Sequence, residues 1–252
     1  MIGFQHVAYA EWYVGGYGGW NWPQALQDVH MNALGEQLLP ARFKNFMETN
    51  SGTVDQTLSS SSVSLKSSPI FGGKAGYFFS DEGFSWLGVE IEAFTTKPSI
   101  KSQTVSTVQD ILYTPNPQQF PQFDCTTAGN QAPSCPQQVR STSQFQLQQS
   151  SMRLIAVAFN VVARYPGKVF QPYIGIGGGA FYFSSSGQVD GHQVVPGLNL
   201  STGLKVLITE EWGLFIEGKY NRATFTNLDP SGLGLSGQYS AFNAVAGLAY
   251  HF

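Results

Sequence analysis

The sequence predicts an eight-stranded antiparallel transmembrane up-and-down β-barrel with two long external loops. Only 12% of the 252 residues are charged, about half the share in soluble domains, while 14% are aromatic and 28 are glycine. Nowhere do about 18 apolar residues follow one another, as a membrane helix requires, and the best run, 154–163, contains Asn160. Instead, eight segments alternate apolar residues with small or polar ones, which is the strand pattern of a membrane barrel.

The composition excludes two other classes of protein. A net charge of −3 leaves no basic surface for nucleic acid, so no nucleic-acid partner is expected. Branched and aromatic residues are too frequent for a disordered chain. A soluble lipocalin barrel would point its apolar residues inward, whereas here the small, glycine-rich and charged face suits a tight interior.

The N-terminal segment resembles the end of an export signal. Ala8-Tyr9-Ala10 has the small-x-small pattern of a cleavage site. We interpret residues 1–10 as a residual signal-peptide tail or a short extension, and residues 11–252 as a single barrel domain.

The first seven strands are read from their period of two. They are expected at 12–22, 70–79, 84–95, 152–163, 171–183, 197–208 and 212–224. The glycine run 175–179 lacks the strand–turn–helix context of a nucleotide-binding loop and is interpreted as strand interior without room for side chains. Large aromatic residues near the strand ends predict interfacial girdles, and these are Trp12, Trp20, Trp22, Trp212 and Tyr220.

The last strand runs from Phe242 to the final residue with one apolar face. Gly247, Tyr250 and Phe252 follow the spacing Gly-x-x-aromatic-x-aromatic. The segment resembles the C-terminal strand of bacterial outer-membrane barrels, and the resemblance implies recognition by the barrel-assembly machinery. It departs from that pattern at Val245, where the family usually has a polar residue.

The connections alternate in length. Tight turns at 80–83, 164–168 and 209–211 alternate with long links at 23–69, 96–151, 184–196 and 225–238, which places both termini on the periplasmic side. Residues 23–48 predict one or two short amphipathic helices, and 50–68 a hairpin or a mobile tip. Cys125 and Cys135 lie in the second long link and are expected to form a disulfide in an oxidising compartment.

The inward face carries three cations and three anions. They are Lys74, Glu90, Glu92, Lys205, Glu217 and Lys219. Buried charges must be paired, so we expect Lys74 to meet Glu90 or Glu92, and Lys205 to meet Glu217. Such pairs either plug the lumen or form a gate that rearranges to pass ions.

Together these strands resemble the small outer-membrane barrel family of the OmpA transmembrane domain, OmpX and neisserial surface protein A. The similarity covers the strands, roughly half of the chain. It implies an integral protein of the bacterial outer membrane in contact with lipid and lipopolysaccharide. Roles in this family include anchoring, adhesion, complement evasion and weak pore activity, and the fold does not choose among them.

Two enzymatic barrels were compared with the histidines of the chain. A lipid A deacylase needs His-x-Ser-Asn, which none of His6, His30, His192 and His251 provides. A palmitoyl transferase needs His, Asp and Ser, for which His30 near Asp28 is the candidate. No two histidines have a metal-ligand spacing, so no catalytic residue, metal or cofactor is expected.

The expected function is therefore non-enzymatic. The chain is predicted to be an outer-membrane surface barrel whose external loops contact an envelope or surface protein. The alternative is a narrow pore or small-solute channel gated by the lumenal Glu/Lys pairs.

Overall fold

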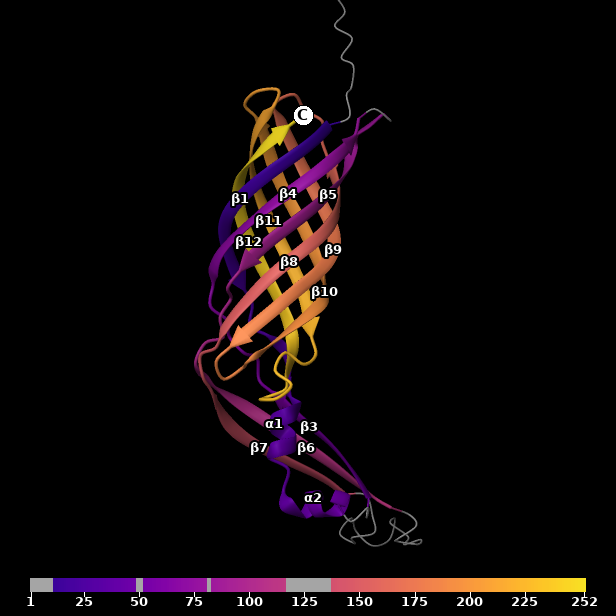
Figure 1. Ribbon diagram of the computed structural model, residues 1–252, viewed down its shortest axis with the longest axis vertical. Coiled ribbons are helices and arrows are strands. Elements are labelled where there is room, and N and C mark those ends of the chain that lie inside the picture. The colour runs from indigo at the N-terminus through magenta and orange to yellow at the C-terminus, as the bar shows by residue number, and fades with distance from the viewer. Residues whose placement is uncertain (1–10, 49–51, 81–82, 117–136) are drawn as a thin grey trace, which may run out of the picture.

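The computed structural model describes residues 11–48, 52–80, 83–116 and 137–252. Eight strands close into a barrel (Figure 1), and each pairs antiparallel with its neighbours. They are β1 (Glu11–Pro23), β4 (Ser68–Phe79), β5 (Phe84–Thr96), β8 (Ser151–Arg164), β9 (Phe170–Ser186), β10 (Gly191–Leu207), β11 (Trp212–Phe225) and β12 (Leu235–His251). The pairing of β1 with β12 closes the barrel, and the prediction of eight strands is confirmed.

The two ends of the barrel differ. At one end β1 begins and β12 finishes, with Tyr13 paired to His251; we name it the terminal end. At the other end four further strands and two helices continue away from the barrel (Figure 1), and we name it the extension end.

The barrel wall presents an apolar outer face and a mixed inner face. Along β8, Ile155, Val157 and Phe159 are exposed while Ala156 and Ala158 between them are buried. Similar exposed apolar residues occur on every barrel strand. Such a belt cannot face water without associating, and it fits the hydrocarbon of a bilayer. The described helices are all too short or too polar to span a membrane.

Inward glycines make room for inward aromatic rings. Tyr13 pairs directly with Gly76, and a Cβ at Gly76 would lie 2.5 Å from the tyrosine ring. Tyr173 pairs with Gly203 in the same way, with a ring carbon 2.6 Å from the Cβ position. An eight-stranded barrel is just wide enough for its side chains, so each large residue requires a small one on the next strand.

The two long links are not loops, which corrects that part of the prediction. They contain β2 (Gln27–Met31), α1 (Asn32–Gln37), α2 (Ala41–Glu48), β3 (Gly52–Ser60), β6 (Gln103–Pro115) and β7 (Gln137–Leu147). The four strands, here named the extension sheet, continue the barrel wall in the order β12-β2-β3-β6-β7. The two short helices were predicted, but β3 pairs with β6 of the other link and not within a local hairpin.

The helices cover one face of the extension sheet. Leu39 and Phe43 pack against Ile111 and Tyr113 of β6 in a small buried cluster. The opposite face carries mainly hydroxyl and amide side chains. Residues 1–10, and with them the signal-peptide prediction, lie outside the described residues, as do Cys125 and Cys135.

Candidate functional site

The lumen holds all six charges that the sequence placed there. Lys74, Glu90, Glu92, Lys205, Glu217 and Lys219 are all buried. They occupy inward positions on β4, β5, β10 and β11, because the pleat sends every second side chain to the interior. They form layers along the barrel axis.

The middle layer centres on Lys74. Its Nζ lies 2.6 Å from Glu217 Oε2 and 3.5 Å from Glu90 Oε2. Tyr13 donates to Glu90 at 2.6 Å, and Tyr173 donates to Glu217 at 2.7 Å. The Lys74–Glu90 contact agrees with the expectation, and Glu217 joins from the opposite wall.

The next layer toward the extension end centres on Glu92. Lys219 pairs with Glu92, and Tyr17 donates to the same carboxylate. Asn199 donates to the second carboxylate oxygen at 2.8 Å. Charge and hydrogen bonds thus satisfy this buried carboxylate completely.

A chain of hydrogen-bonded asparagines connects five strands and joins both of these layers. Asn21 donates to Asn243 at 2.6 Å, Asn243 to Asn221 at 2.7 Å, and Asn221 to Asn199 at 2.8 Å. Asn199 donates to Asn160 at 2.9 Å, and Asn160 then donates to Glu90 at 3.1 Å. Every amide in the run passes one hydrogen bond to the next, and each member helps to fix the next rotamer.

The terminal end holds a cluster that the charge prediction missed. Arg164 binds both carboxylate oxygens of Glu11, one of them at 2.8 Å, and His251 contacts the same carboxylate. Gln171 accepts from Arg164 at 3.3 Å. The sequence does contain a signal for this cluster, because residues an even number apart on a strand face the same side. Glu11 is two residues from the inward Tyr13, and Arg164 is four residues from the inward Asn160. The strand expected at 152–163 stops one residue short of Arg164, whereas β8 includes Arg164 as its last residue.

The expected pair between Lys205 and Glu217 is wrong. Lys205 Nζ lies 3.2 Å from His251 Nε2 and 4.3 Å from the centre of the Tyr13 ring, while Glu217 pairs with Lys74. Lys205 pairs with Phe215 in the β10–β11 register, two residues from Glu217 toward the terminal end. The stagger of the strands therefore carries the lysine into the terminal layer.

Apolar side chains close the extension end of the lumen. Phe181, Phe183, Phe225 and Tyr239 are all fully buried there, with Phe183 5.4 Å from Phe225 and 5.5 Å from Tyr239 between ring centres. Residues of the connecting segments, including Leu26, continue this cluster beyond the strands. An apolar layer without charges excludes water and ions.

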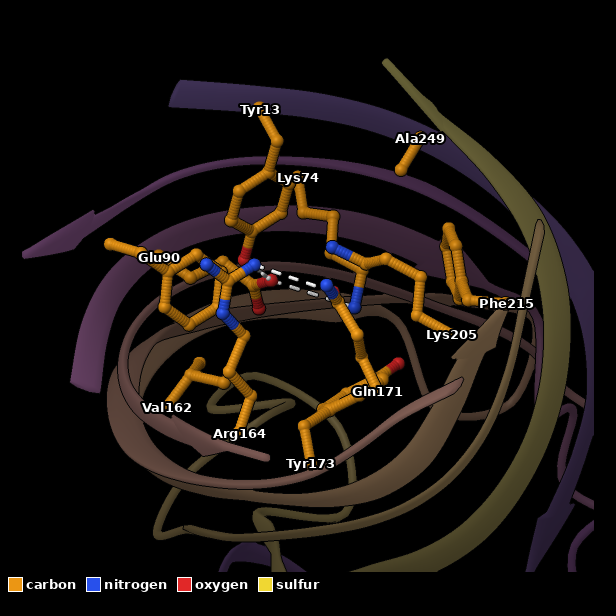
Figure 2. A pocket seen from close by; sticks show the side chains of 11 residues that line it. Tyr13, Lys74, Glu90, Val162, Arg164, Gln171, Tyr173, Lys205, Phe215 and Ala249 are labelled. Atoms are coloured by element: carbon orange, nitrogen blue, oxygen red, sulfur yellow. Dashed lines mark hydrogen bonds and ion pairs between the residues drawn. The ribbon is translucent and has the colours of Figure 1, made fainter. Parts of the chain in front are cut away.

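The polar part of the lumen is almost filled. Figure 2 shows Tyr13, Lys74, Glu90, Arg164 and Lys205 converging from different strands around one cavity. The cavity measures about 10 Å³, which is room for about one water molecule.

The predicted girdle residues lie on the outer face. Trp12, Trp20, Trp22 and Trp212 are exposed, and Tyr220 is half-buried. Trp12 and Trp212 lie toward the terminal end, with Trp12 5.0 Å from Tyr77 between ring centres. In the C-terminal signal, Tyr250 lies 5.1 Å from the ring of Phe252, while Gly247 faces inward beneath Phe215.

The enzymatic candidate is incomplete. His30 Nδ1 lies 3.3 Å from Ser59 Oγ in the extension sheet. Within the described residues Asp28 makes no hydrogen bond or ion pair with His30, so the third member of such a cluster does not join the other two. Nor do the described residues contain a group of three His, Cys, Asp or Glu side chains that could hold a metal ion.

No family model and no curated protein matches the chain. Among solved structures, it is similar to neisserial surface protein A, with 14% identity over 96% of this chain and 97% of the other and a TM-score of 0.45. It is also similar to outer membrane protein OprG of Pseudomonas aeruginosa, with 12% identity over 97% and 96% of the chains and a TM-score of 0.43.

A third match is the attachment invasion locus protein Ail of Yersinia pestis, solved with the heparin analogue sucrose octasulfate. The identity is 10% over 96% and 98% of the two chains, with a TM-score of 0.42. The chain is similar to small outer-membrane β-barrels. Neisserial surface protein A is one of the proteins whose strand pattern the sequence resembles.

Proposed function

We propose that this protein is a non-enzymatic barrel of the bacterial outer membrane that anchors an interaction surface, the extension sheet, and does not act as a pore. The observation that carries the proposal is the filled lumen. Four basic and four acidic side chains balance one another in charge inside it, and three of the cations pair directly with carboxylates. The cavity beside Tyr13 and Lys74 has room for about one water molecule, and an apolar layer covers the extension end.

The layout of the chain supports the orientation that we propose. Short turns join the strands at the terminal end, and the extension continues from the other end. Short periplasmic turns with long external segments are the usual arrangement of outer-membrane barrels. The extension sheet then lies outside the cell and both termini are periplasmic.

The free edge of β7 is the part of the extension best suited to a protein partner. Among the strands that the structure describes, β7 is the last of the sheet, and it pairs with β6 without a register shift. Ser106 of β6 bonds through its backbone toward β3, accepting from Ser61 N at 2.9 Å. The backbone of the next residue, Thr107, therefore faces β7, and so its partner Ser143 faces β6.

The even-numbered residues of β7 consequently point their N–H and C=O groups away from the sheet. Thr142 is the central one, and within its strand neither a proline nor a lysine protects the edge. Such an edge accepts an extended segment of another protein as an additional strand.

Planar-bilayer conductance of the refolded protein tests the proposal. We expect a silent membrane, with folding shown by heat-modifiable gel mobility. Steady openings that change with Glu90→Gln would instead establish the gated narrow pore.

Photo-crosslinking in cells tests the interaction surface. A benzophenone side chain at Thr142 is expected to give a discrete adduct, which Gln144→Pro in the same chain abolishes because it removes an outward N–H. The matched control is Thr114, on the same face but on β6, where no adduct through the free edge is expected. Adducts at neither position would refute β7 as the docking edge.

A further inference from the structure

Basic side chains gather where the barrel wall joins the extension. Here the segments 61–67, 97–102 and 148–150 lie together, because Lys66 N donates to Ser99 O at 2.8 Å and Lys101 N donates to Ser64 O at 3.1 Å. We name this junction the neck. Lys66, Lys97 and Lys101 are exposed on the neck, and Arg153 is exposed beside it near the start of β8.

Two of these cations continue the lipid-facing surface. Thr96 and Leu154 form the last pair of the β5–β8 ladder, so Lys97 and Arg153 follow on adjacent strands. Both have the outward parity of Thr95 and Ile155, and Arg153 Nε donates to Thr95 Oγ1 at 3.4 Å. They therefore lie at the border of the apolar belt that is nearest the extension end, where lipid headgroups begin.

No carboxylate neutralises this cluster within the part of the chain that the structure describes. None of its ion pairs involves any of the four cations. Lys66 Nζ donates to the neutral amide of Gln149 at 2.9 Å. Asp190, in the β9–β10 turn near Ser150, is exposed and forms no ion pair.

Like charges at facing positions of adjacent strands destabilise a sheet. In contrast, every charged side chain inside the lumen has a polar or ionic partner. The distribution along the barrel is also uneven, because the turn at the terminal end between β10 and β11 carries Glu210 and Glu211. An external anion at the neck would remove the repulsion between Lys97 and Arg153.

We propose that Lys97 and Arg153, with Lys66 and Lys101 farther from the membrane, bind the phosphate of an anionic lipid headgroup. A lipid is the occupant because the cations end the apolar columns of β5 and β8, so the acyl chains of the same molecule lie on Ile155 and Val157. The guanidinium of Arg153 gives two parallel hydrogen bonds to phosphate oxygens, and the lysines add point charges. This site is independent of what β7 binds and of conductance.

Electron spin resonance with spin-labelled lipids tests the site. The full-length protein is reconstituted in phosphatidylcholine bilayers with trace spin-labelled phosphatidic acid or spin-labelled phosphatidylcholine, and the motionally restricted fraction gives the relative association constant. We expect preference for phosphatidic acid, and a loss of about fivefold or more in the double variant Lys97→Gln with Arg153→Gln.

Arg222→Gln is the matched control. Arg222 is also an outward arginine, on β11, but its guanidinium bonds Gln238 at 2.5 Å, so we expect the preference to persist. Lys97→Arg should also keep it. Folding of each variant is checked by heat-modifiable mobility.

Three results would overturn the proposal. They are equal association of both lipids with the unmodified protein, an unchanged preference in the double variant, and an equal loss in Arg222→Gln, which would indicate net charge alone. Competition by 10 mM inorganic phosphate separates the two sources of the anion. Persistence of the preference supports the lipid, and its complete loss would assign the site to free phosphate.

Discussion

Asn199 donates a 2.9 Å hydrogen bond to Asn160, although β9 lies between their strands. Gly177 of β9 is paired with both residues, with Asn199 on one side and Asn160 on the other. The two amides meet over this glycine, which has no side chain to separate them. A Cβ at Gly177 would overlap Asn160 Oδ1 and the carbonyl oxygen of Phe159.

Gly177→Ala is therefore expected to destabilise the barrel. The added methyl group displaces Asn160 and interrupts the asparagine chain, so we expect the free energy of unfolding to fall by about 1–3 kcal/mol. Urea unfolding in lipid vesicles, followed by tryptophan fluorescence, measures it. Gly16→Ala is the control, because nothing lies within 4 Å of a Cβ at that outward position; an equal effect of both would contradict the explanation.

Removing only Lys219 from its ion pair with Glu92 should lower the free energy of unfolding more than removing both charges. Lys219→Met leaves a buried, uncompensated carboxylate, and we expect a loss of about 3–5 kcal/mol in the free energy of unfolding. The double variant Lys219→Met with Glu92→Gln removes both charges and should recover most of this loss. A double-mutant cycle by equilibrium unfolding measures the coupling, and additive effects would argue against the pair.

The apolar layer and the filled polar lumen are expected to block conduction in series. Phe181→Ala with Phe183→Ala removes two fully buried rings from the extension end, but the polar lumen stays filled, so we expect a silent planar bilayer. Glu90→Gln should also remain silent, because the apolar layer is intact. Openings in the double phenylalanine variant would assign the barrier to the apolar layer alone, and openings in Glu90→Gln would assign it to the charges.

A proline in β7 should weaken the pairing with β6 at odd-numbered positions, whose N–H groups face β6, and not at even-numbered positions, whose N–H groups face away from the sheet. Ser143→Pro removes an N–H that faces β6 and should loosen the β6–β7 ladder, whereas Thr142→Pro removes an outward N–H and should leave the ladder closed. Amide hydrogen exchange of β6 measures this, with faster exchange expected only for Ser143→Pro. The reverse order would mean that the assigned edge is wrong.

Hydrophobic alternation along the chain determined the barrel. Period-two patterns are local, because the pleat fixes which side chains face lipid and which face the lumen. They gave all eight barrel strands and the inward placement of residues such as Lys74 and Glu217. The same parity, applied to Glu11 and Arg164, would have found the terminal cluster.

Tertiary structure decided the rest. Lys205 meets His251 and not Glu217, because the stagger between strands sets which inward residues share a layer. The pairing of β3 with β6 joins segments from two different links. The buried face of β6 includes polar residues such as Thr107 and Gln109, so its alternation gives little local signal in the sequence. The neck cluster exists because segments of the two long links meet beside the start of β8, which brings together four cations that are scattered along the sequence.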